Sequence, residues 1–267
     1  MHVNYRYLLD FAERQRDNTF DYTVLDYGCG AADVVQAGRE RGLNVYGAEV
    51  FYAGGSTREI VRQKGLLGTV VREIQDGHLN FPNSFFDLVI NNQVFEHVKE
   101  LDRVLGEIDR VLKPGGKVLC VFPSRESWRE PHCGIPFLHW FPVRSKLRYW
   151  YALLLRRAGL GYHKGDKTAE QWTKDFLNWI DEYCHYRTRK SVLDSLRRHF
   201  QVELIEWDYV AFRLKGPNRR IAALFGFPLL NALSSLLFAR LGFLVILGIK
   251  SSQATASDKV SPREHQW

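Results

Sequence analysis

The sequence predicts an α/β fold built around a nucleotide-binding βαβ unit. The apolar run from Val24 to Tyr27 is typical of a buried strand, and it ends in a tight glycine turn, Gly28-Cys29-Gly30. A second short strand, residues 43–49, closes on Glu49. This pattern is typical of a site for an adenosine-type ligand: a strand, a glycine loop that a ligand can approach closely, a helix, and then an acid on the next strand. The ribose hydroxyls of the ligand would donate hydrogen bonds to that acid.

The charge of the glycine loop favours a cationic ligand. A dinucleotide fingerprint has a third small residue where this loop has Asp33, and Asp26 lies just before the first glycine. Acids in that position would repel a pyrophosphate. S-adenosyl-L-methionine has no phosphate, and its methionine end carries an ammonium and a sulfonium. The acidic rim therefore favours this cofactor over NAD.

Three later motifs follow in order, and a known family carries similar ones. They are a strand with its lead-in (Phe81 to Ile90), a turn (Gln93 to Val98) that contains Glu96-His97-Val98, and a helix end (Ile108 to Gly116) that reads Arg-Val-Leu-Lys-Pro-Gly-Gly. Together with the glycine turn, they resemble the motifs of the class I S-adenosylmethionine-dependent methyltransferases. The resemblance implies a Rossmann-like, seven-stranded, mostly parallel sheet with helices on both faces, and a fifth strand over Lys117 to Phe122.

The resemblance also implies cofactor-binding roles. Asp26, Gly28 and Gly30 would contact the methionine part, and Cys29 would contribute its backbone. Glu49 would bind the ribose, and Val50 would pack on the adenine. The turn at Asp76-Gly77 would face the adenine amino group, and Asn91 and Asn92 would lie along the other side. Asp76 could simply be a turn residue, because Asp-Gly is a common turn pair. Asp87 lies at the start of a strand, and we expect it to have a structural role. The expected cofactor-binding residues are Asp26, Gly28, Cys29, Gly30, Glu49, Val50, Asp76, Gly77, Asn91 and Asn92.

Length and composition indicate one large domain, residues 1–250, followed by a polar tail, 251–267, that we expect to be disordered. The four cysteines are scattered and form no CxxC pair. Cys133 and Cys184 each adjoin a histidine, but adjacent residues rarely bind one ion together, so we expect no metal. Free thiols and an N-terminus without a signal pattern suit the cytoplasm.

Outside the βα core, which runs from residue 23 to about 124, the sequence predicts four further elements. They are an opening helix over about residues 1–20, a helix over Arg189 to His199, a strand from Gln201 to Trp207 that could extend through Leu214, and a final strand over Phe243 to Ile249.

Two segments are surplus to the family plan, and we expect them to hold the acceptor. The first, residues 125–186, leaves the ligand-binding edge of the sheet and opens with a loop rich in proline, histidine and aromatic residues. His132, or less readily His139, could take a proton from an acceptor hydroxyl, or both could simply cap the pocket. His97 has the same two interpretations. Gln93 stands where quinone-type relatives often carry Glu, which disfavours a metal-assisted reaction.

The second surplus segment, residues 215–241, raises the question of a membrane. Residues 221–239 contain no charge, and a basic stretch, 215–220, precedes them. Two interpretations fit these residues: a pair of lid helices that covers an apolar substrate pocket or dips into a membrane face, and plain core packing. A true span is disfavoured because residues 243–249 must return to the sheet. Residues 146–157 resemble an interfacial helix, so peripheral membrane contact is expected through 144–157 and 215–241.

These observations predict methyl transfer from S-adenosyl-L-methionine, mainly to an oxygen of a small or lipid-linked apolar acceptor. The formal charge of +7 raises the alternative of a nucleic-acid methyltransferase. Asn91-Asn92-Gln93-Val94 stands where such enzymes hold a base, and it lacks their motif. A non-catalytic binding protein on the same fold is the other alternative. It would be expected to have a spoiled cofactor loop, whereas the loop here is intact.

Overall fold

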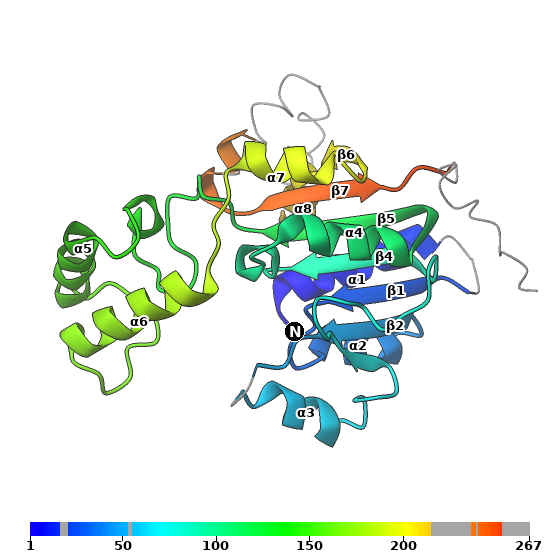
Figure 1. Ribbon diagram of the computed structural model, residues 1–267, viewed down its shortest axis with the longest axis horizontal. Coiled ribbons are helices and arrows are strands. Elements are labelled where there is room, and N and C mark those ends of the chain that lie inside the picture. The colour runs from blue at the N-terminus through cyan, green and yellow to red at the C-terminus, as the bar shows by residue number, and fades with distance from the viewer. Residues whose placement is uncertain (17–20, 53–54, 215–235, 239, 253–267) are drawn as a thin grey trace, which may run out of the picture.

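The computed structural model describes residues 1–16, 21–52, 55–214, 236–238 and 240–252. Seven strands in these ranges form one sheet (Figure 1). They are β1 (Thr23–Tyr27), β2 (Asn44–Glu49), β3 (Val71–Glu73), β4 (Phe86–Asn92), β5 (Leu112–Phe122), β6 (Gln201–Leu204) and β7 (Leu244–Ile249). Their order is β3-β2-β1-β4-β5-β7-β6, and β7 runs antiparallel to both of its neighbours. The predicted Rossmann-like, mostly parallel sheet is confirmed.

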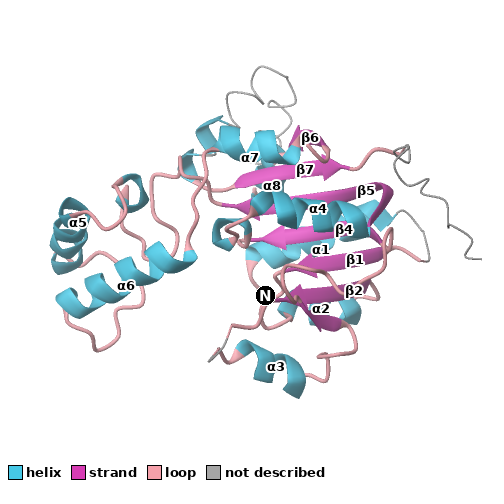
Figure 2. Cartoon of the chain, viewed as in Figure 1, coloured by secondary structure: helices cyan, strands magenta, loops and turns pink. Residues whose placement is uncertain are grey.

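Helices cover both faces of this sheet (Figure 2). One face packs on α4 (Leu101–Val111) and α7 (Arg189–Leu196), and the other packs on α1 (Val3–Arg16), α2 (Asp33–Glu40), α3 (Thr57–Gln63) and α8 (Glu206–Arg213). All five residues of β1 are buried, because a central parallel strand is covered on both sides. The apolar runs that predicted β1 and β4 follow from this double burial.

The segment between β5 and α7 forms a lobe with a small core of its own. It contains η2 (Leu138–Trp140), α5 (Lys146–Arg157) and α6 (Ala169–Tyr183), and it lies beyond the carboxyl ends of the parallel strands (Figure 1). Ser145 caps α5, and α6 opens with a capping box between Thr168 and Gln171. The predicted helix over 146–157 is present as α5, whereas α6 was not among the predicted elements.

The lobe is tied to the core where its two ends meet. The backbone N–H of Arg125 donates to the carbonyl of Arg187 at 2.9 Å. The Arg187 guanidinium donates to the carbonyls of Phe95, Val98 and Lys99 in the loop that carries η1 (Phe95–His97). The entry and exit of the lobe are therefore adjacent and fixed to the turn after β4.

Two predicted boundaries are wrong. The strand expected to run from residue 201 toward 214 ends at Leu204, because residues 206–213 fold as α8 and bury Glu206 and Tyr209 on one side. The Tyr209 ring packs edge-on against Tyr7 of α1, 5.0 Å between centroids, so tertiary packing selects the helix. The fifth strand begins at Leu112 rather than Lys117, with a register irregularity opposite Phe86.

The other predicted elements agree with the structure wherever their residues are described. The opening helix is α1, the helix after the lobe is α7 and ends at Leu196, and the final strand is β7. Most of residues 215–241 and the tail beyond 252 lie outside the described residues. Among those described, no helix has the length and apolar character that a membrane span requires.

Candidate active site

The glycine turn after β1 is held in a conformation that favours glycine. Gly28 and Gly30 have φ values of +76° and +52°, and the N–H of Gly28 donates to the Ala48 carbonyl at 2.8 Å. A Cβ on Gly28 would lie 2.3 Å from the Val94 side chain, whereas one on Gly30 would meet nothing within 4 Å. The turn is thus locked against the loop after β4, and open space lies beside the Gly30 backbone. The Cys29 N–H already donates to Ala48, at 3.1 Å.

Two acids flank this turn at the carboxyl ends of β1 and β2. The Glu49 carboxylate accepts from the N–H of Gly30 at 2.6 Å and from that of Val50 at 2.9 Å. Asp26 is buried, and burial, followed by the charges of Glu49 and Asp33, raises its pKa to about 8. Lys64 pairs with Asp33 at 2.6 Å but not with Asp26. A ligand carrying an ammonium or a sulfonium would offset this buried negative charge, so the residues fit S-adenosyl-L-methionine and not a pyrophosphate.

The other predicted cofactor residues differ in how they are placed. Both polar atoms of the Asn91 side chain are buried and have no partner among the described residues. The Asn92 side chain accepts from Asn4 at 3.0 Å, and Val50 is 43% exposed. Asp76 is an exposed turn residue with φ +49°, followed by Gly77 with φ +71°. Asp87 has the structural role that the sequence indicated, because it accepts from Thr23 and Lys113.

His132 in the lobe is backed by a buried carboxylate. Its Nδ1 lies 2.9 Å from Oε1 of Glu130, whose side chain is fully buried. Burial by itself would raise the pKa of Glu130, but hydrogen bonds from His132, Tyr186 and the Cys133 N–H lower it to about 2. Because the ionised carboxylate only accepts, Nδ1 of His132 carries the proton, which leaves Nε2 as the acceptor nitrogen of the neutral ring.

His97 is the second predicted catalytic histidine, and its ring lies 5.0 Å from that of His132. Its Nδ1 donates to the Tyr183 carbonyl at 2.8 Å, and burial lowers its pKa. The Cys184 sulfur lies 3.9 Å from this nitrogen and 3.8 Å from Nδ1 of His132. These three residues offer donor atoms within 4.8 Å of one another, but both Nδ1 atoms already donate to oxygens. The described geometry is that of a hydrogen-bonded cluster.

His139 lies apart from this cluster. It is buried, its Nε2 lies 3.2 Å from the Arg125 carbonyl, and burial lowers its pKa. It lines a different cavity from the one that His132 lines. This placement suits packing rather than contact with an acceptor.

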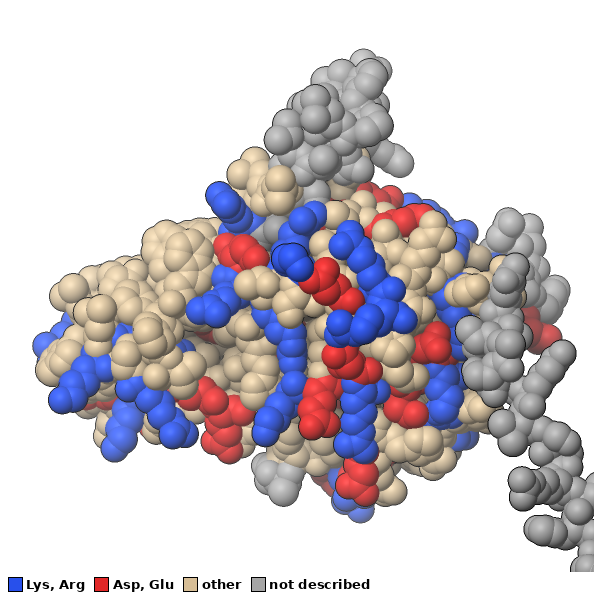
Figure 3. Space-filling model, turned by 45° about the horizontal axis from the view of Figure 1, so that its top comes forward, with Lys and Arg blue, Asp and Glu red and all other residues tan. Residues whose placement is uncertain are grey.

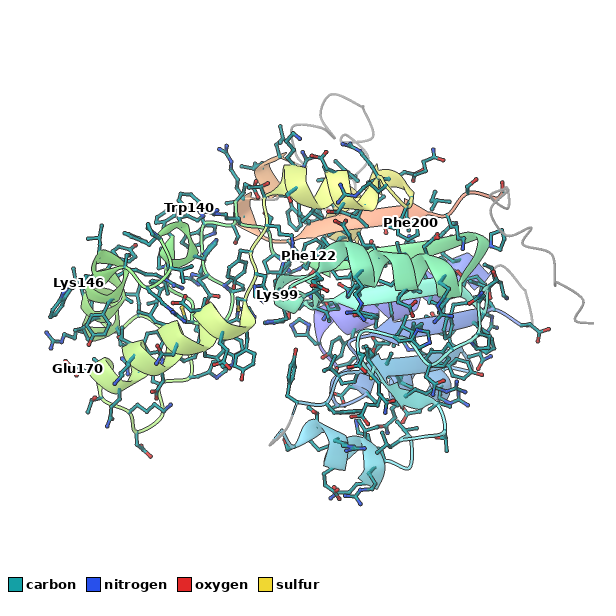
Figure 4. The ribbon with its side chains drawn as sticks, in the orientation of Figure 1. Lys99, Phe122, Trp140, Lys146, Glu170 and Phe200 are labelled. Carbon is teal, nitrogen blue, oxygen red and sulfur yellow. The ribbon has the colours of Figure 1, made fainter. Side chains whose placement is uncertain are left out.

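A cavity of about 520 Å³ opens beside His132 in the lobe. Its walls include Phe176 and Trp179 of α6, with Lys167 and Asp175 paired at 2.7 Å on one side. The rings of Trp179, Tyr183 and Tyr52 follow one another at 5.8 and 6.0 Å. This aromatic row leads from the cavity to the end of β2. Phe122 and Lys99 lie at the edge of the sheet that faces the lobe (Figure 4).

Glu130 and Tyr186 are the site residues that sequence reasoning missed. They lie 56 positions apart, and a loop and two helices separate them. The available signal was local: in Glu130-Pro131-His132 an acid precedes a histidine by two residues across a rigid proline. Tyr186 had no comparable signal, because only the fold of the lobe brings it near.

Comparison with known proteins decides the family of this fold and loop. The Methyltransferase domain family matches residues 25–120, from β1 through most of β5. The matched region is a methyltransferase domain, and its fold and loop are those of the class I S-adenosylmethionine-dependent type. The cofactor of this family, S-adenosyl-L-methionine, is the one that the acidic loop favours.

The curated relatives of this chain are distant. It is 22% identical over 178 residues to a ubiquinone biosynthesis O-methyltransferase of Proteus mirabilis, covering 65% of each chain. It is 31% identical over 136 residues to a demethylmenaquinone methyltransferase of Symbiobacterium thermophilum, covering 48% of this chain and 51% of the other. The chain thus spans between about half and two thirds of the length of these relatives. A solved S-adenosylmethionine-dependent methyltransferase from Mesorhizobium loti is 16% identical, with a TM-score of 0.47 and coverage of 91% and 98%.

Proposed function

We propose that this protein transfers a methyl group from S-adenosyl-L-methionine to a hydroxyl oxygen of a small apolar acceptor. The observation that carries the proposal is the acidic turn at the ends of β1 and β2, which faces the lobe that holds His132. Asp26 and Glu49 would bind the cationic and ribose parts of the cofactor, and Asn91 would contact it from β4. When bound, the cofactor supplies an electrophilic methyl group on a sulfonium.

In this proposal His132 is the proton acceptor. Its Nε2 would take the proton of the acceptor hydroxyl, which makes the oxygen a stronger nucleophile. The imidazolium that results would be stabilised by the Glu130 carboxylate, 2.9 Å from Nδ1. Glu130 acts through His132 and is therefore a positioning residue. His97 would help to hold the turn after β4 through its bond to the Tyr183 carbonyl.

The support for an apolar acceptor is the cavity beside His132. Phe176, Trp179 and Pro131 give it apolar walls, and its volume of about 520 Å³ lies in the range of small-molecule sites. An acceptor with a ring or a hydrocarbon part fits these walls. The names of the two quinone-pathway relatives agree with such a class.

A lipid-linked form of the acceptor, presented at a membrane surface, is part of the proposal. Its support is the peripheral membrane contact that the sequence predicts through residues 144–157 and 215–241. The structure describes residues 144–157, and most of residues 215–241 lie outside the described residues. The proposal includes a cytoplasmic location, and its support is the four free cysteines.

Calorimetric titration with S-adenosylhomocysteine and, separately, with NADH tests the cofactor half of the proposal. We expect micromolar binding of the first ligand only, lost in Glu49→Ala and kept in the control Glu59→Ala, which changes an exposed acid on α3. Binding of NADH, or equal affinity in both variants, would contradict the assignment.

The acceptor half needs its own measurement. Methyl transfer to simple phenols and to lipid-linked hydroxyl compounds would be followed by release of S-adenosylhomocysteine. Transfer to neither class, in protein that binds the cofactor, would reject the acceptor proposal. A salt-sensitive gel shift with mixed RNA would favour the nucleic-acid alternative instead.

A further inference from the structure

The outer face of α5 is apolar and exposed. Leu147, Trp150 and Leu154 are 67%, 61% and 67% exposed, and their spacing of three and four residues puts them on one side of the helix. The opposite side, with Ala152 and Leu153, is buried. Val143, 65% exposed, lies just before the helix. Val143, Leu147, Trp150 and Leu154 are called the apolar ridge below.

Two more exposed aromatic side chains lie in the loop that precedes α5. Phe137 and Trp140 are 40% and 47% exposed, and their rings lie 4.8 Å apart. In Figure 3 the lobe, at the left, presents a broad uncharged surface with Lys and Arg side chains along its lower margin. Contiguous exposed apolar surface that is rimmed by charge marks an interaction site more often than a plain solvated face.

Three cations lie beside the ridge. Arg144, Lys146 and Lys174 line a cavity of about 290 Å³ together with Trp150. None of the three, called the basic cluster below, has an ion-pair partner among the described residues. The acid in the same wall, Asp181, is already paired with the buried Arg148. The first turn of α5 carries no acid, so the positive end of the helix adds to the potential here.

We propose that the apolar ridge and the basic cluster dock this protein on an anionic phospholipid membrane. Leucine and tryptophan side chains of the ridge would enter the boundary between headgroups and acyl chains, as in interfacial helices. The cations of the basic cluster would bind lipid phosphates. The docking does not need methyl transfer, but its purpose rests on the proposed function, since it would hold the His132 cavity near lipid-linked acceptors.

A second copy of the chain fits this surface less well. In a twofold dimer the same patch faces itself, so the basic clusters of the two copies would be brought together without acids to neutralise them. The patch comprises only a few side chains of one helix and loop, which is small for a stable interface. Anionic lipid complements both the charge and the apolar character.

Vesicle sedimentation of the full chain tests the proposal. We expect binding to vesicles that contain phosphatidylglycerol, weak binding to phosphatidylcholine alone, and a loss of binding as salt rises from about 0.1 M to about 1 M. Leu147→Glu/Trp150→Glu should abolish binding. Arg144→Glu/Lys174→Glu should weaken it about tenfold or more, because each basic residue near the surface adds to the attraction. The matched control, Lys190→Glu on α7 with Arg197→Glu at its C-terminal cap, changes the net charge equally and should bind like the wild type.

Each outcome of the vesicle experiment either supports or overturns membrane docking. Because the ridge residues are more than 60% exposed, the variants should fold, which circular dichroism checks. No vesicle binding by the wild type, or unchanged binding by the ridge variant, would overturn the proposal. So would a dimer in sedimentation velocity that the ridge variant dissociates. Binding of S-adenosylhomocysteine, measured without vesicles, reports separately on the proposed function.

Discussion

At the scale of single residues, Glu130 stands out because it is fully buried and yet ionised. It accepts from His132, Tyr186 and the Cys133 N–H, and this set of donors holds its pKa at about 2. A carboxylate so held fixes the proton of His132 on Nδ1. Its effect on the reaction would therefore pass through the imidazole ring.

We expect Glu130→Gln and His132→Gln each to lower kcat about 100-fold, the usual size of a lost acid–base contribution. The double variant should be no slower than either single one, because the two residues act as a unit. Single-turnover kinetics would check this, with the exposed Glu182→Gln as control. Affinity for S-adenosylhomocysteine should not change. Additive losses would mean that Glu130 has only a structural role.

Asp26 should make cofactor affinity depend on pH. Its pKa is raised from 3.8 to about 8, so in the free protein the stabilising contribution of the neutral form is complete below pH 3.8 and is lost as the pH rises through about 8. The ammonium group of S-adenosylhomocysteine would pair with the ionised form. Calorimetry should therefore show affinity for S-adenosylhomocysteine rising with pH up to about 8, by at most about tenfold per pH unit. Asp26→Asn should flatten the profile and weaken binding, whereas an unchanged profile would contradict this role for Asp26.

At the scale of elements, one buried ion pair joins the two long helices of the lobe. Arg148 of α5 pairs with Asp181 of α6, and their side chains are 3% and 10% exposed. Removing Asp181 would leave an uncompensated buried cation, which costs about 3 kcal/mol. We expect Asp181→Ala to increase hydrogen exchange across residues 146–183 while β1 and β4 stay protected. Uniform loss of protection across the chain would show that the lobe and the sheet unfold together.

The elements that sequence predicts well are those with local determinants. The run from Val24 to Gly30 specifies a buried strand and a left-handed turn within seven residues, and the family motifs add the order of β4, α4 and β5. The strand predicted from Gln201 to Trp207 was allowed to extend through Leu214, whereas contact of Tyr209 with Tyr7 favours a helix over residues 206–213. The contact of His132 with Tyr186 could not be predicted, since it depends on how α5 and α6 fold between them.

At the scale of the whole molecule, a ligand that binds only the folded protein should stabilise it. S-adenosylhomocysteine at about 100 times its Kd adds about 2.7 kcal/mol. For a chain of 267 residues this corresponds to a rise in Tm of roughly 5–10 °C. Differential scanning fluorimetry should show the rise in the wild type and in Glu59→Ala, and none in Glu49→Ala. A rise in Glu49→Ala would place the ribose contact elsewhere.

The hydrogen bond between Arg125 and Arg187 has a consequence for how such a protein can diversify. A stretch of chain whose two ends touch can be lengthened, shortened or replaced by recombination without rerouting the strands that flank it. Descendants could then inherit the half that holds the methyl donor and receive a new half that selects the recipient. On this view the lobe is an exchangeable unit whose boundary lies where Arg125 and Arg187 meet.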